Sequence, residues 1–121
     1  MTGNSLIRIR PETLQAWLAE GNTVLVDVRE HTEFALEHIR GAHLMPLWNL
    51  DPSALPQSRR IVLCCASGNR SQTAARRLGF EGIAHLEGGL AAWKAAGYPT
   101  VHRQPFNPAS IERFQRAAQH A

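Results

Sequence analysis

The sequence has few cysteines, almost no lysine and no long hydrophobic segment. Its two cysteines, Cys64 and Cys65, are adjacent in a chain of 121 residues. They could join only in a strained bond between neighbours, so they cannot form the disulfide framework of a small secreted protein. No apolar segment is long enough to cross a membrane, and the polar residues 1–5 are not followed by a secretory signal. These absences favour a cytoplasmic protein whose thiols stay reduced.

Signatures of metal and nucleic-acid binding are also missing. The six histidines are dispersed without the spacing of a metal-binding pair, so no metal site is expected. The formal net charge is +3 and nearly all basic residues are arginine. These arginines are scattered and do not alternate with aromatic residues, which argues against nucleic-acid binding. The arginine excess reflects either a bias in base composition or the attraction of small anions.

The length of the chain fits a single domain. We expect the domain at residues 5–103 and a C-terminal linker with an amphipathic helix at 104–121. Asn107 can cap that helix, and Pro108 suits its first position. The helix either packs on the domain or contacts a partner or a membrane surface through residues 108–120.

The hydrophobic pattern predicts alternating strands and helices. Strands are expected at Leu6–Ile9, Val24–Val28, Ile61–Cys64 and Ile83–Leu86, and helices after Pro11, at Thr32–Glu37, before Gly79 and at Leu90–Ala96. Unbroken apolar runs such as Ile61–Cys64 are typical of strands buried on both faces of a parallel sheet. Trp48 falls in a loop, where it lines the mouth of a pocket or, by preference, packs as a core or lid residue.

The segment around the cysteines carries the clearest chemistry. A buried strand leads into a loop that opens with Cys65 and ends with Arg70 at the start of a helix. Unpaired N–H groups at a helix start would point at the Cys65 sulfur and favour its thiolate. Gly68 lets the loop turn tightly, and the guanidinium of Arg70 presents a planar set of donors to an anionic substrate.

Three blocks of the sequence resemble rhodanese-domain sulfurtransferases. The blocks are Cys65–Ser71, with the pattern Cys-x-x-Gly-x-Arg-Ser; Leu25–Arg29, followed by Glu33-Phe34 and His38–Ala42; and Leu86–Gly89, followed by Trp93 and Gly97–Pro99. The resemblance covers residues 17–101. It implies an α/β fold of three layers, in which a parallel five-stranded sheet has helices on both faces.

The resemblance also implies sulfur transfer by double displacement. The thiolate of Cys65 would take a sulfur atom from a small anionic donor, thiosulfate or a persulfide, and pass it to cyanide or to a thiol, including a protein thiol. The loop residues expected to bind the donor are Ala66, Ser67, Gly68, Asn69, Arg70 and Ser71. Asp27 and Arg29 are expected to support the loop, paired with each other or with Glu33. No cofactor is required.

Two other functions remain open from the sequence. Counting from Cys64 gives Cys-x5-Arg70, the spacing of cysteine phosphatases, including those that share the rhodanese fold. Side chains alternate along a strand, so Cys64 and Cys65 should point to opposite faces; we favour Cys65 as the nucleophile and Cys64 as a buried strand residue. The third possibility is a sulfur carrier or regulatory binding module without turnover.

Overall fold

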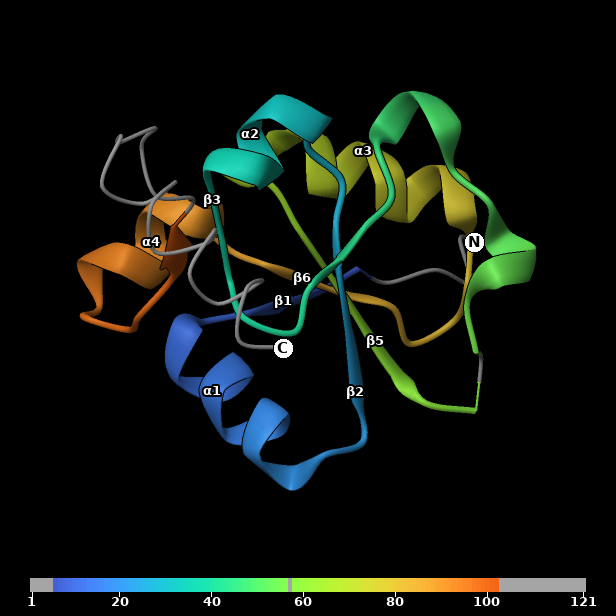
Figure 1. Ribbon diagram of the computed structural model, residues 1–121. Coiled ribbons are helices and arrows are strands. Elements are labelled where there is room, and N and C mark those ends of the chain that lie inside the picture. Colours follow the sequence, from blue (N-terminus) through green and yellow to red (C-terminus); the bar gives the residue numbers. More distant parts are fainter. Residues whose placement is uncertain (1–5, 57, 103–121) are drawn as a thin grey trace, which may run out of the picture.

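The computed structural model of the protein describes residues 6–56 and 58–102 (Figure 1). Its strands are β1 (Ile7–Ile9), β2 (Thr23–Asp27), β3 (Glu37–His38), β4 (His43–Leu44), β5 (Arg60–Cys64), β6 (Ala84–Leu86) and β7 (Val101–His102). Its α-helices are α1 (Pro11–Glu20), α2 (His31–Leu36), α3 (Asn69–Leu78) and α4 (Gly89–Ala95), and two 3-10 turns are η1 (Leu47–Asn49) and η2 (Pro52–Ala54). Strands and helices therefore alternate, as the hydrophobic pattern predicts.

The main sheet has five parallel strands in the order β1-β6-β5-β2-β4. Its two central strands, β2 and β5, are buried along all but their first residue. Strands of this kind need helices over both faces, because neither face has polar side chains to meet water. The expected parallel α/β architecture is confirmed.

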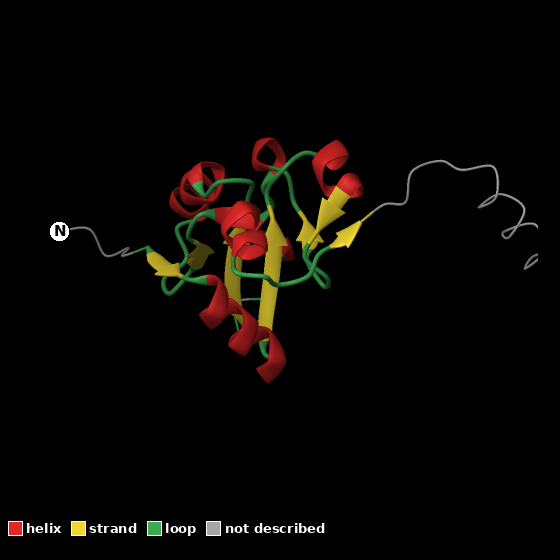
Figure 2. Ribbon diagram, turned by 90° about the vertical axis from the view of Figure 1, so that its left-hand side faces the viewer, coloured by secondary structure: helices red, strands yellow, loops and turns green. Residues whose placement is uncertain are grey.

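Helices cover the two faces of this sheet as separate layers (Figures 1 and 2). On one face, α1 and α4 pack against the sheet through Leu14, Leu90 and Trp93. On the other face, α3 packs through Ala74 and Leu78. Trp93 is 2 % exposed and so packs inward.

The connections divide at the carboxyl ends of β2 and β5. After β2 the chain moves outward to the edge strand β4, and after β5 it crosses to β6 on the other side. Loops that leave neighbouring parallel strands in opposite directions open a crevice at that edge of the sheet. Asp27 and Cys64, the last residues of β2 and β5, are direct partners across the ladder. The segment after Asp27 and the cysteine loop therefore meet at one place.

A second, two-stranded sheet was not expected from the sequence. Helix α2 stops at Leu36, one residue before the expected end, because Glu37 is extended with φ −162°. Glu37 and His38 form β3, which pairs antiparallel with β7. Strands of two residues carry no readable periodicity, and this pairing joins segments far apart in the chain.

Trp48 is not a core residue, so the core interpretation of this side chain is wrong. Its side chain is 66 % exposed in η1. The indole N–H donates to a carboxylate oxygen of Glu30 at 3.0 Å. The hydrogen bond, rather than burial, holds the ring in place.

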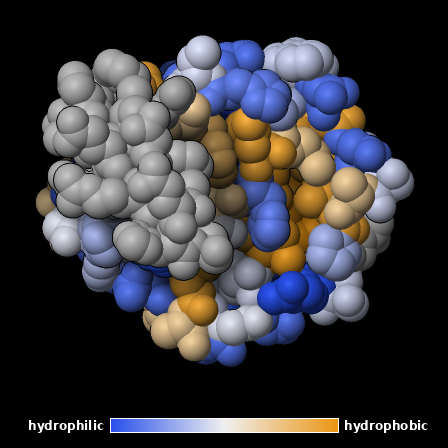
Figure 3. Space-filling model, viewed as in Figure 1, coloured by the Kyte–Doolittle hydropathy of each residue, from blue (hydrophilic) through white to orange (hydrophobic). Residues whose placement is uncertain are grey.

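The surface seen in Figure 3 has hydrophobic residues gathered where β2 runs in Figure 1, between more hydrophilic borders. The edge strand β4 is only two residues long, and the apolar residues beyond it, Met45, Leu47 and Leu50, pack against the core while staying partly exposed.

No helix in the described part of the chain has the length and apolar character needed to span a bilayer. The predicted C-terminal linker and helix, with the contact surface at 108–120, lie outside the described residues.

Candidate active site

The cysteine loop connects the central strand β5 to helix α3. The Cys65 sulfur is directed at the start of α3 and is 1 % exposed. The backbone N–H of Gly68 donates to this sulfur at 3.1 Å, and that of Ser71 donates at 3.4 Å. Both amides belong to the first turn of the helix, where N–H groups have no partner within the helix. Together with the partial positive charge of the helix end, they form a site suited to a sulfur anion.

The start of α4 fixes the loop from its other side. The N–H groups of Leu90 and Ala91 donate to the carbonyl oxygens of Cys65 and Ala66, at 2.8 and 3.1 Å. This contact requires Gly89, since a Cβ there would lie against the Cys65 carbonyl oxygen and 2.7 Å from the Ala66 carbonyl. The close approach of this glycine to the loop was not expected from the sequence, because the two segments are distant in the chain.

The two cysteine sulfurs lie on opposite faces of the sheet, as strand alternation predicts. Cys65 packs with the residues of the α3 layer, and Cys64 packs with the α1 and α4 layer. Burial raises the pKa of the Cys64 thiol well above its ordinary value, and the charge of Asp27 adds to this. Cys64 is therefore held as a neutral thiol.

Arg70 forms a bidentate salt bridge with Glu33, from the first turn of α2. The two N–O distances are 2.7 and 2.9 Å. The hydrogen bonds from Arg70 lower the pKa of Glu33 to about 2, and the N–H of Glu30 contributes further. About a third of each side chain is exposed, so the pair lies at the surface of the site. The guanidinium expected to face a substrate thus holds an internal carboxylate.

Asp27 and Arg29 pair with each other rather than with Glu33. The Arg29 guanidinium donates to both carboxylate oxygens of Asp27, at 2.8 to 3.0 Å, and both residues are buried. Arg29 also donates to the carbonyl oxygen of Glu37. This buried pair ties the end of β2 to β3.

Ser71 and His85 form a contact that the sequence did not reveal. The Ser71 hydroxyl lies 3.6 Å from the Cys65 sulfur and 2.8 Å from Nδ1 of His85 on the neighbouring strand β6. His85 is 1 % exposed. Its position in a short apolar strand gave only the signal of a buried polar residue, which needs a partner. The other loop side chains, Ser67 and Asn69, are exposed.

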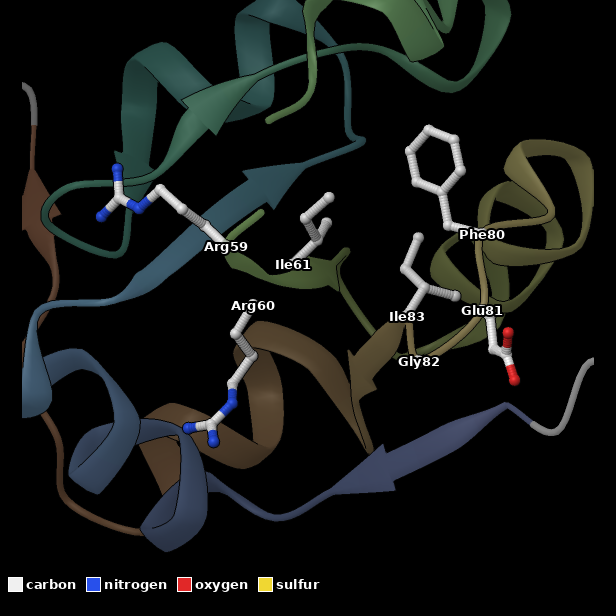
Figure 4. Close-up of a pocket in the computed structure, with 7 residues that line it drawn as sticks. All are labelled: Arg59, Arg60, Ile61, Phe80, Glu81, Gly82 and Ile83. Atoms are coloured by element: carbon white, nitrogen blue, oxygen red, sulfur yellow. The ribbon is translucent and has the colours of Figure 1, made fainter. Parts of the chain in front are cut away.

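A cavity of about 160 Å³ lies at the opposite edge of the sheet, away from the cysteine loop. Figure 4 shows its lining residues, which are Arg59, Arg60, Ile61, Phe80, Glu81, Gly82 and Ile83. These residues come from the amino-terminal ends of β5 and β6 and from the turn between α3 and β6. Within the described ranges, no cluster of three or more His, Cys, Asp or Glu side chains could hold a metal ion.

Known proteins resemble this chain over most of its length. The rhodanese-like domain model matches residues 10–96. An uncharacterised protein from Synechocystis, slr1261, is 52% identical over 100 residues, covering 78% of this chain and 56% of that protein. The chain thus spans little more than half the length of that relative. The thiosulfate sulfurtransferase GlpE from Pseudomonas fluorescens is 36% identical over 102 residues, covering 80% of this chain and 92% of that protein.

A solved structure shares the whole architecture. The crystal structure of the Alr3790 protein from Anabaena aligns with a TM-score of 0.72 and 32% identity, and the alignment covers 91% of each chain.

Proposed function

Because the chain belongs to the rhodanese-like domain family, we propose that it is a sulfurtransferase that moves a sulfane sulfur through a persulfide on Cys65. The donor is thiosulfate or a persulfide, and the acceptor is a thiol or cyanide. Support comes from GlpE, a relative named as a thiosulfate sulfurtransferase, which this chain matches over 92% of its length. A cytoplasmic location fits this proposal, because a reducing compartment keeps Cys65 free to react.

The observation that carries the proposal is the position of the Cys65 sulfur against two helix-start amides. The N–H groups of Gly68 and Ser71 both point at the sulfur. Donors fixed in advance cost no reorganisation when charge develops, which is the main reason such sites accelerate reactions. The thiolate of Cys65 places its negative charge where these donors converge.

The proposed reaction has two displacements. The Cys65 thiolate attacks the outer sulfur of thiosulfate, a new S–S bond forms, and the S–S bond of the donor breaks as sulfite leaves with the electron pair. The acceptor, cyanide or a thiolate, then attacks the outer sulfur of the persulfide. Thiocyanate or a new persulfide leaves, and the Cys65 thiolate is restored.

The Glu33 salt bridge adds a condition on donor binding. An anionic donor that uses the Arg70 guanidinium must share it with, or displace, the Glu33 carboxylate. We therefore propose that Arg70 exchanges one carboxylate oxygen for an oxygen of the donor. Partial exposure of both side chains makes this exchange sterically simple.

The phosphatase alternative would require Cys64 as nucleophile. Its sulfur is fully buried on the other face of the sheet, and burial raises the pKa of its thiol. A nucleophile in a ring around phosphate needs the thiolate and access to the loop amides. Both requirements favour Cys65. A carrier or regulatory module without turnover is the remaining alternative.

Intact-protein mass spectrometry after incubation with thiosulfate tests the proposal. The wild type and Cys64→Ser should each gain one sulfur atom, and cyanide should remove it. Cys65→Ser should gain none, with Cys64→Ser as its matched control. Absence of sulfur uptake together with Cys64-dependent hydrolysis of an aryl phosphate would replace the proposal with the phosphatase. Absence of both activities would leave a binding module.

A further inference from the structure

His85 is a buried histidine that the reaction described above does not use. It lies in the middle of β6, between β1 and β5, and is 1 % exposed. Its Nδ1 is 2.8 Å from the hydroxyl oxygen of Ser71 on α3. Its Nε2 is buried and has no hydrogen-bond partner among the described residues. Among the described residues, the ring therefore hydrogen-bonds only through Nδ1, and its partner is Ser71, which lies beside the sulfur of Cys65.

The Ser71 hydroxyl has one proton and several acceptors within reach. The carbonyl oxygen of Gly68 lies 3.1 Å away, Nδ1 of His85 lies 2.8 Å away, and the Cys65 sulfur lies 3.6 Å away. A hydroxyl donates one hydrogen bond but accepts two. The tautomer of His85 thus decides what Ser71 can do. A bare Nδ1 competes for the serine proton. A protonated Nδ1 donates to Ser71 and leaves that proton to the carbonyl oxygen of Gly68, to which the hydroxyl donates at 3.1 Å, or to the sulfur of Cys65 once that sulfur is charged.

Burial and charge keep His85 neutral. Burial lowers the pKa of its imidazole, and Arg8 on the adjacent strand lowers it further, while Glu87 opposes them. A neutral imidazole carries one proton, on one of its two nitrogens. In the described part of the chain, Nε2 lacks a partner in either tautomer, but an orphaned buried N–H is rarer in proteins than an under-satisfied acceptor, which disfavours a proton on Nε2. On Nδ1 the same proton is hydrogen-bonded to Ser71.

Resting on the proposed sulfur transfer, we infer that His85 is a positioning residue: its Nδ1–H donates to Ser71 Oγ and turns the serine hydroxyl toward the charged sulfur of Cys65. The sulfur anion then receives a third hydrogen bond, in addition to those from the amides of Gly68 and Ser71. His85 contacts neither the donor nor the acceptor, and it neither gains nor loses a proton during the reaction.

The test measures thiolate formation independently of sulfur transfer. In a Cys64→Ser background, the rate of Cys65 alkylation by iodoacetamide is followed against pH. His85→Leu removes the donor to Ser71, so the midpoint should move upward by about one pH unit, the equivalent of roughly one hydrogen bond to a charged group. His85→Asn should bring the midpoint most of the way back to that of the His85 protein, because the asparagine amide can occupy the place of Nδ1. Ile83→Val, a change in the same core layer, should leave the midpoint unchanged.

A double-mutant cycle separates positioning from general damage to the fold. In a Ser71→Ala background, His85→Leu should cause no further shift, because the hydroxyl that links His85 to the sulfur is gone. An unchanged midpoint in His85→Leu, or an equal shift with and without Ser71, would overturn the inference. If His85→Leu does not fold by circular dichroism, His85→Gln replaces it, because the longer amide reaches the Nε2 position instead.

The outcomes also distinguish this inference from the proposed function. A shifted alkylation midpoint without sulfur uptake from thiosulfate would support the role of His85 and refute the proposed sulfurtransferase activity. Sulfur uptake with an unshifted midpoint would support the sulfurtransferase activity and refute the role of His85.

Discussion

Replacing Gly89 by alanine should damage both the fold and the cysteine loop. Gly89 is the first residue of α4 and has φ +61°. An added Cβ would press on the carbonyl oxygen of Cys65 and lie 2.7 Å from the carbonyl carbon and oxygen of Ala66. These are backbone atoms, so no flexible side chain can move aside. The start of α4 and the cysteine loop must separate.

The cost has two parts. A left-handed conformation costs a residue with a Cβ about 1–2 kcal/mol. Separation also weakens the hydrogen bonds that Leu90 and Ala91 donate to the carbonyls of Cys65 and Ala66, each with a net contribution of about 1 kcal/mol. Gly89→Ala should therefore lower the free energy of unfolding by roughly 3–4 kcal/mol, a large effect for one methyl group.

Urea unfolding measures this loss, and Gly79→Ala is the matched control. Gly79 has φ +68° but no atom within 4 Å of an added Cβ, so it should lose only the conformational part, about 1–2 kcal/mol. Sulfur uptake by the folded fraction should also slow in Gly89→Ala and not in Gly79→Ala. Equal losses of stability in the two variants would refute the reasoning, because the close approach to the loop would then carry no energy.

Three further changes test the ion pairs and the core. Asp27→Asn should cost about 3–5 kcal/mol in urea unfolding, because Arg29 stays buried without its carboxylate; a loss below about 1 kcal/mol would contradict this. The lowered pKa of Glu33, about 2 against an ordinary 4.5, means that its pair with Arg70 stabilises the fold above about pH 4.5 and that this contribution fades as the pH falls toward 2. Glu33→Gln should remove that pH dependence, which amounts to about 1–2 kcal/mol of unfolding free energy after allowance for solvent screening. If the unfolding free energies of both proteins varied with pH in parallel, this interpretation would be wrong. Trp93→Phe keeps an aromatic ring in the core but leaves the carbonyl oxygen of Pro99 without its indole N–H donor. Tm should therefore fall by an amount equivalent to about 1–2 kcal/mol. An unchanged Tm would show that this hydrogen bond does not stabilise the fold.

Much of the fold was readable because its signals are local. The buried runs of β2 and β5 consist mainly of apolar side chains, which a sheet covered on both faces requires. Gly21 and Gly79 adopt the left-handed conformation and so end α1 and α3. The errors arise instead from contacts between separate segments of the chain. Glu37 was expected to be the last residue of a helix, yet its pairing with β7 holds it extended. Trp48 looked like a core residue because of its size, but its hydrogen bond to Glu30 keeps it at the surface.

The sequence by itself determined that a thiol would stand at a turn from a buried strand into a helix, with the neighbouring thiol on the opposite face. Both facts follow from residues adjacent in the chain: the strand period of two separates Cys64 from Cys65, and the helix start supplies unpaired N–H groups.

Only the tertiary structure decided which groups surround that thiol. It paired Arg70 with Glu33, placed His85 behind Ser71 and brought Gly89 against the loop. These contacts join different segments whose meeting depends on strand order at the carboxyl edge of the sheet. No periodicity or local propensity records that order, because it is fixed by how the layers pack.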